Sequence, residues 1–370
     1  MQISSLKILA LTVGIFFFTN NLSTSFLPIY YMEIGLNVNE IVQLLLSTFI
    51  VIGLLPITLL KLVKNFEKII TFGILSTALF FVTLIYIKNP IILGLTYGLS
   101  IATFWPSFNL LQFRLSETQI RARTVSLFSS IIPSIASIIG PAVGGFVAST
   151  FGFPTLFAIS IALYITAFLF SRHIKFQLET HKFTIPKTRT FKIFFISFIL
   201  LGLSEAYWLA YPLFVNKISG GTFQMGLVLA ASAVLICGVT FLVNWLSDIK
   251  RTRVNFAIIG AVLNAIWYFA ISFASVPQEI VALSLLSGFA SAFSLSWFAH
   301  YGDSFSKEYY ASILVMLEAG LMIGRILNLA PTNIFISTAN YTNYFTLLGL
   351  VWLLLIPLYL IAKRTKTGAI

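Results

Sequence analysis

Three formally charged side chains lie inside long apolar segments of this chain: Glu205, Glu318 and Arg325. A charge surrounded by hydrocarbon is costly, so such residues are candidate functional groups. Counted at the helical rise from the ends of their segments, Glu205 and Arg325 lie about 18 and 21 Å deep. We therefore predict that they form an ion pair whose pairing or protonation changes as the protein works. A static pair that only positions two helices is the alternative.

Glu318 lies seven residues before Arg325, which places both on the same face of a helix. The axial separation of about 10 Å predicts no direct contact between them. Burial without a partner favours the neutral form of a carboxyl group, so Glu318 is a second candidate proton site. A protonated Glu318 that only hydrogen-bonds another helix is the alternative.

The segments that must position these residues are apolar and long. The chain has 370 residues, of which 58% are hydrophobic and 9% charged, with a mean hydropathy of +0.97. Soluble domains carry about 25% charged residues, so this composition indicates an integral membrane protein. Twelve segments have the length of a transmembrane helix. They are residues 8–32, 41–60, 69–87, 91–113, 124–148, 155–171, 193–215, 225–247, 254–275, 280–301, 311–336 and 344–362.

The basic residues predict how these helices are oriented. Of 23 Lys and Arg residues, all except Lys88, Lys217 and Arg325 fall in connections that lie on one side if the helices alternate. Cytoplasmic loops hold the basic residues of membrane proteins, so both termini are predicted to be cytoplasmic. The net charge of +12 then reflects orientation and contact with anionic lipids, and not nucleic-acid binding. We expect a multi-pass protein of the cell membrane.

The chain also reads as two similar halves. Residues 1–171 and 193–370 each contain six predicted helices, and the polar residues 172–192 form a predicted cytoplasmic linker. The second-to-third and fourth-to-fifth connections begin at nearly the same distance from the start of each half. This spacing predicts two six-helix bundles related as parallel repeats, a pattern typical of secondary transporters.

A local motif in the fifth predicted helix adds a family resemblance. Residues 136–145 read Ala-Ser-Ile-Ile-Gly-Pro-Ala-Val-Gly-Gly. They resemble the fifth-helix motif of the drug/proton antiporter branches of the major facilitator superfamily. Gly140 and Gly144 form a small-residue ridge that lets a helix approach closely, and Pro141 permits a bend, while Gly145 completes the motif. A generic packing face is the alternative.

Two positions depart from the resembled family. The loop between the second and third helices, residues 56–65, lacks the family's acidic residue, whereas its counterpart in the second half keeps Asp248. The resemblance implies that Asp248 helps to stabilise one access state. Gly94 stands where a basic residue of the fourth helix is expected, which weakens an antiport mechanism based on that residue.

In the resembled fold, helices one, four, seven and ten line a central path. Their polar and aromatic residues are therefore candidate substrate-binding groups, because amides hydrogen-bond solutes and aromatic rings stack on them. These candidates are Asn20, Asn21, Tyr97, Trp105, Tyr207, Trp208, Tyr211 and Trp297.

The sequence contains no GxxxxGK[ST], HExxH or GxSxG pattern, so we expect no enzyme and no cofactor or metal. We predict a monomeric secondary transporter that works by alternating access. Its expected function is proton-coupled export or antiport of small amphipathic organic molecules, with substrate, protons and membrane lipids as partners. Proton symport or facilitated uptake of a sugar, nucleoside or organic acid is the alternative. An intramembrane enzyme built on Glu205, His300 and Glu318 is a third.

Overall fold

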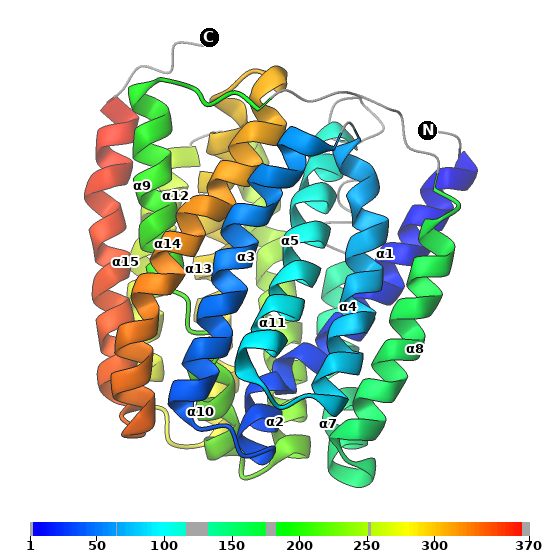
Figure 1. Ribbon diagram of the computed structural model, residues 1–370. Coiled ribbons are helices and arrows are strands. Elements are labelled where there is room, and N and C mark those ends of the chain that lie inside the picture. Colours follow the sequence, from blue (N-terminus) through cyan, green and yellow to red (C-terminus); the bar gives the residue numbers. More distant parts are fainter. Residues whose placement is uncertain (1–2, 64, 116–131, 175–182, 251–252, 365–370) are drawn as a thin grey trace. The chain divides into compact units, whose positions relative to one another are not determined.

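The computed structural model describes residues 3–63, 65–115, 132–174, 183–250 and 253–364 (Figure 1). Within these residues the chain is helical and contains no strand. In the described part of the chain, eleven helices are long and apolar enough to cross a membrane. The chain divides into two compact units, Met1–Phe183 with Gly220–Ala230, and Thr184–Ser219 with Ala231–Ile370.

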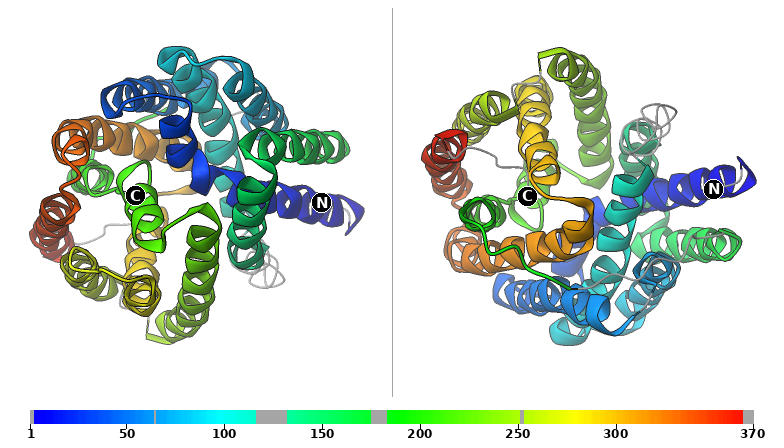
Figure 2. Two further views of the ribbon diagram at one scale, coloured as in Figure 1. Left: turned by 90° about the horizontal axis from the view of Figure 1, so that it is seen from below. Right: turned by 90° about the horizontal axis from the view of Figure 1, so that it is seen from above.

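The first unit is built around contacts that α1, α4 and α5 make with their neighbours. Its elements are α1 (Ile3–Ser23), η1 (Thr24–Phe26), α2 (Leu27–Glu33), α3 (Val38–Leu62), η2 (Phe66–Lys68), α4 (Ile69–Tyr86), α5 (Pro90–Leu115), α7 (Ile132–Phe151) and α8 (Phe153–Ser171). Helix α5 packs against α3 and α4, and α1 packs against α7 and α8. The end-on views of Figure 2 show α1 running beside α8.

Glycines let several of these helices touch backbone to backbone. A Cβ at Gly94 of α5 would collide with the carbonyl oxygen of Leu44 in α3. Position 94, where the resembled family has a basic residue, therefore has no room for any side chain. In α7, Gly140 and Gly144 lie against Asn21 and Leu22 of α1 in the same way.

The second unit is built around the contacts that α9 and α12 make with their neighbours. Its elements are α9 (Arg189–Leu203), α10 (Ala210–Ser219), the later part of α11 (Thr222–Lys250), α12 (Arg253–Ile271), α13 (Pro277–Asp303), η4 (Lys307–Tyr309), α14 (Tyr310–Ser337) and α15 (Tyr341–Arg364). Helix α9 packs against α14 and α15, and α12 packs against α13 and α15. Figure 1 shows α9, α14 and α15 side by side.

The seventh predicted span, residues 193–215, is not one continuous helix, and this part of the prediction is wrong. Helix α9 has 15 residues and α10 has 10, and the chain between them, residues 204–209, is not helical. Hydropathy measures composition, and this segment is apolar on both sides of the break. The first span is also interrupted, because the 3-10 turn η1 separates α1 from α2. Both interruptions belong to spans that the family resemblance places on a central path.

Candidate functional site

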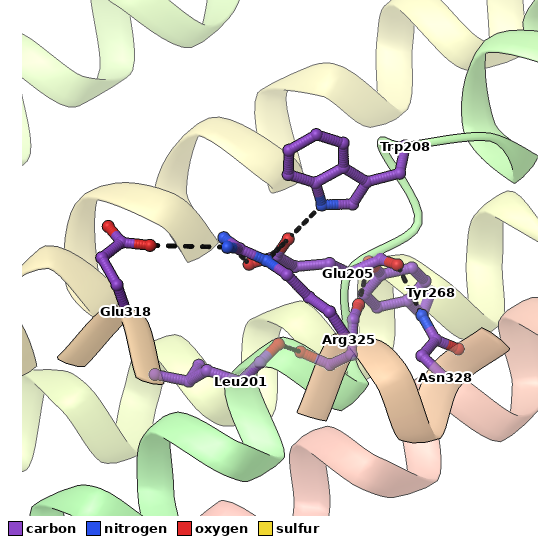
Figure 3. Close-up of polar contacts among 8 residues, drawn as sticks. Leu201, Glu205, Trp208, Tyr268, Glu318, Arg325 and Asn328 are labelled. Carbon is purple, nitrogen blue, oxygen red and sulfur yellow. Dashed lines mark hydrogen bonds and ion pairs between the residues drawn. The ribbon is translucent and has the colours of Figure 1, made fainter. Parts of the chain in front are cut away.

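Glu205 lies in the break between α9 and α10, and its carboxylate is bound by Arg325 of α14. Arg325 donates from Nε to Oε2 at 2.8 Å and from Nη2 to Oε1 at 2.9 Å (Figure 3). This two-pronged geometry is the strongest form of a guanidinium–carboxylate contact. The side chains of Arg325 and Glu205 are 10% and 22% exposed, so Glu205 is the more accessible partner. The structure thus brings together the two residues that the depth argument paired.

Glu318 also reaches Arg325, contrary to the prediction that the two would not touch. The Oε2 atom of Glu318 lies 3.5 Å from Nη1 of Arg325. The prediction compared positions along the helix axis, but two long side chains on one helix face lean toward each other and span two turns. One guanidinium therefore serves two carboxyl groups, and the contact to Glu318 is single and longer.

Trp208, a predicted substrate-binding residue, is part of this charged cluster. Its indole Nε1 donates to Oε2 of Glu205 at 2.5 Å. Its ring lies beneath the guanidinium, with Cζ of Arg325 5.2 Å from the ring centroid. An aromatic face and a cation attract each other at this separation. Trp208 therefore stabilises both members of the ion pair.

The main chain at the break is held by residues that the sequence did not single out. Tyr268 of α12 donates to the carbonyl oxygen of Ser204 at 2.7 Å, and Asn328 of α14 donates to that of Glu205 at 2.7 Å. Within an α-helix such carbonyls are paired internally, and at a break they need other donors. The sequence feature that could have identified Asn328 is its position three residues after Arg325, on the same face of a predicted helix.

Close packing of α9 on α14 positions the ion pair. A Cβ at Gly324 would collide with the carbonyl oxygen of Ile199, and one at Gly202 would collide with that of Leu321. Gly324 directly precedes Arg325 in the chain. The small residues bring α14 against the end of α9, so that the Arg325 side chain reaches the break.

Tyr207 and Tyr211 lie next to the cluster. Tyr207 is 56% exposed although it is in the middle of a predicted span. Its ring makes an edge contact with Tyr211 at 5.8 Å, and Tyr211 contacts Trp267 at 5.8 Å. An exposed aromatic ring beside a half-buried carboxylate is suited to contact a ring-bearing polar solute.

The first-unit candidates have different surroundings. Asn20 is half-buried just before η1, and its carbonyl accepts from Thr24 Oγ1 at 2.6 Å. The amide of Asn21 donates to Phe17 of its own helix at 2.9 Å, and its Cβ lies at the α1–α7 contact. Tyr97 stacks on Phe80 at 4.5 Å and Trp105 is half-buried, with an edge contact to Phe17 at 5.7 Å.

Trp297, expected to line the path, is instead inside the second unit. Its side chain is fully buried, and its Nε1 donates to Ser197 Oγ at 2.8 Å. Its ring packs on Phe194 and Tyr359, with centroid separations of 4.5 and 4.2 Å. Face periodicity alone cannot distinguish a helix face toward solvent from one toward neighbouring helices. Trp297 therefore joins α9, α13 and α15.

The gating candidate and the fifth-helix motif can be placed only in part. Asp248 lies near the end of α11, and its side chain is outside the described residues. Gly145 and Pro141 of α7 lie against Gly226, which belongs to the same unit. The three glycines of the motif, Gly140, Gly144 and Gly145, are thus each used in a helix contact. Among the described residues, no three His, Cys, Asp or Glu side chains are grouped as a metal site would need.

Comparisons with known proteins support the fold. No family model matches the sequence. The chain is 25% identical to the uncharacterized protein YqgE of Bacillus subtilis (strain 168) over 180 residues, covering 45% of this chain and 41% of that relative. It is 26% identical over 160 residues to an uncharacterized protein in the sodM 3' region of Geobacillus stearothermophilus, covering 40% of this chain and 73% of that one.

A solved structure resembles almost the whole chain. The crystal structure of the nucleoside transporter NupG superposes with a TM-score of 0.73 and 14% sequence identity, covering 98% of this chain and 100% of that one. The sequence match spans only 41% of the length of YqgE, whereas the structural match to NupG spans 98% of this chain and 100% of that one. The chain therefore has the all-helical fold of this nucleoside transporter, with Glu205, Arg325 and Glu318 clustered at a break in one helix.

Proposed function

We propose that this chain is a secondary transporter that carries a small organic solute across a membrane by alternating access, coupled to protons. The contact of two carboxyl groups with one guanidinium at a helix break is the observation that carries the proposal. Discontinuous helices at mid-membrane depth commonly form transporter binding sites. The likeness to a transporter over 98% of the chain agrees with this proposal.

The charge balance of the cluster supports proton coupling. If Glu205 and Glu318 are both ionised, Arg325 leaves one negative charge uncompensated, and one bound proton makes the cluster neutral. An uncompensated charge is costly in apolar surroundings, so a proton binds readily there. We assign this proton to Glu318, because Glu205 receives the two shorter bonds from Arg325 and a third from Trp208.

Uptake of a ring-bearing, hydroxyl-rich solute such as a nucleoside fits the site better than export of amphipathic molecules. The exposed Tyr207 offers a stacking surface near the hydrogen-bonding carboxylate of Glu205. NupG, which shares the fold, is described as a nucleoside transporter. The export hypothesis depended on the fifth-helix motif, and the packing of Gly140, Gly144 and Gly145 accounts for that motif without reference to direction.

The test uses the purified chain in liposomes with radiolabelled uridine and a lipophilic cation, tetraphenylphosphonium. An inward proton gradient should drive uridine accumulation, and a protonophore should abolish it. Proton-driven movement of the cation in the opposite direction, without uridine transport, would favour the export alternative. If neither probe nor a panel of sugars and organic acids moves faster than in protein-free liposomes, the proposal is wrong.

A further inference from the structure

Helix α14 holds Glu205 at two separate points. Arg325 binds the carboxylate, and Asn328 donates to the main-chain oxygen of the same residue at 2.7 Å. Arg325 and Asn328 are three residues apart, so they project from the same face of α14. One helix thus fixes both the side chain and the backbone of residue 205, as Figure 3 shows.

A chain of buried hydroxyl groups supports the Asn328 amide from the side away from Glu205. Tyr344 of α15 donates to Asn328 Oδ1 at 3.2 Å, and the hydroxyl groups of Thr332 and Tyr344 are 3.0 Å apart. A phenol has one hydrogen, so Thr332 must donate to Tyr344. Asn328, Thr332 and Tyr344 are 5%, 4% and 1% exposed, which leaves little room for exchange with water. Because the main-chain carbonyl of Glu205 can only accept, the Asn328 nitrogen faces it and Oδ1 accepts from Tyr344.

We infer that Asn328 is a positioning residue that maintains the break at residues 204–209 and thereby aims the Glu205 carboxylate at Arg325 and Trp208. The direction of a side chain depends on the main-chain conformation at its own residue. Without this donor, the main chain at Glu205 would rotate until its carbonyl oxygen met another donor. The rotation would also change the direction of the Glu205 carboxylate. Tyr268 supports the preceding carbonyl from α12, whereas α14 contacts both the carboxylate and the main-chain oxygen of Glu205. The role of Asn328 in transport rests on the proposed function.

Hydrogen exchange of the full-length protein in nanodiscs tests the local claim without any substrate. In Asn328→Ala, peptides covering residues 204–211 should exchange about tenfold faster, the effect of losing one buried hydrogen bond. The matched control is Asn264→Ala. Asn264 is 7% exposed in the same unit and donates to Gly260 and Ser294, neither of which belongs to residues 204–209. Its replacement should leave this peptide unchanged.

Two further variants separate positioning from general destabilisation. Tyr344→Phe keeps the ring and removes the donor to Asn328, so we expect a smaller acceleration, about threefold. Asn328→Asp should restore slow exchange at pH 5, where a protonated carboxyl can donate to Glu205, and lose it at pH 8. Wild-type protein measured at both pH values is the reference, because Glu205, Glu318, Arg325, Tyr268 and Tyr344 all face this site.

The outcomes distinguish this inference from the proposed function. Unchanged exchange at residues 204–211 in Asn328→Ala, or equal acceleration of Asn328→Asp at both pH values, overturns it. If exchange responds as expected but wild-type liposomes move no solute, the positioning role stands and the transporter proposal fails. Where uridine is transported, Asn328→Ala should lower its rate about tenfold. Combining it with Glu205→Gln should then add little, because both act on one group.

Discussion

Arg325 and Glu205 are joined by two nearly equal hydrogen bonds, 2.8 and 2.9 Å long, although 120 residues of sequence separate them. The carboxylate comes from a helix break and the guanidinium from a continuous helix. A change in the pairing therefore acts on the less regular of the two partners, the segment between α9 and α10.

The fork-like contact predicts that lysine cannot replace Arg325. Lysine carries the charge but not the paired donors, so Arg325→Lys should reduce uridine transport at least tenfold. Arg325→Ala leaves the half-buried Glu205 carboxylate without its cation and should destabilise the protein by about 3 kcal/mol, measured by thermal unfolding. The control is Arg253→Lys, since Arg253 pairs with Asp303 at 2.6 Å on an exposed surface. Equal effects at positions 253 and 325 would contradict a special role for the buried pair.

The indole donor of Trp208 predicts a difference between two tryptophans. Trp208→Phe keeps a ring near Arg325 but removes the bond to Glu205, so it should slow transport several-fold with a small loss of stability. Trp352 is 9% exposed, and its Nε1 has no hydrogen-bond partner among the described residues. Trp352→Phe should therefore leave transport unchanged. Transport rates of the two variants, normalised to protein content, provide the comparison.

If Glu318 carries the coupling proton, its replacement should affect uridine exchange and uridine accumulation differently. Glu318→Gln mimics the protonated residue at every pH, so exchange of uridine across equilibrated membranes should continue. Accumulation driven by a proton gradient should be lost, because the variant cannot release a proton. Exposed Glu33 at the end of α2 supplies the control Glu33→Gln, which should accumulate uridine normally. If Glu318→Gln accumulates uridine with an unchanged pH profile, Glu318 is not the coupling site.

The contact of Gly324 with α9 predicts a steric effect. A methyl group there collides with the carbonyl of Ile199, so Gly324→Ala should destabilise the protein by about 1–3 kcal/mol and loosen the ion pair. Gly238 of α11 has no neighbouring atom within 4 Å of an added Cβ. Gly238→Ala should be neutral or slightly stabilising, because alanine favours helices. Apparent melting temperatures in detergent should separate the two variants clearly.

Hydropathy and charge were sufficient to predict a helical membrane protein and to select Glu205 and Arg325. Depth along a helix is fixed by the rise per residue, so two charges on different helices can be compared without a structure. The same argument failed for Glu318, because it ignored the length of the side chains. It could not place Trp297 either, since an aromatic residue on a helix can face a path or a neighbouring helix.

Hydropathy did not predict the break in the seventh span, and the reason is physical. No proline or glycine lies within residues 204–209, but Pro212 follows closely and has no N–H to donate to the carbonyl of Trp208. The partners of the exposed carbonyls, Tyr268 and Asn328, come from helices that follow much later in the chain. Pro212 weakens a helix at this point, and tertiary hydrogen bonds from Tyr268 and Asn328 then determine where the main chain departs from it.

This dependence has a consequence for how the protein is made. When residues 189–219 leave the ribosome, the side chains that bind the carbonyls of Ser204 and Glu205 have not yet been synthesised. In a lipid environment those carbonyls must be satisfied within the segment itself, which favours entry as one uninterrupted helix. The break can form only after α12 and α14 have been inserted. A chain truncated before α12 lacks all of these partners and should keep this segment helical, whereas Asn328→Ala retains Tyr268 and Arg325 and should only loosen the break.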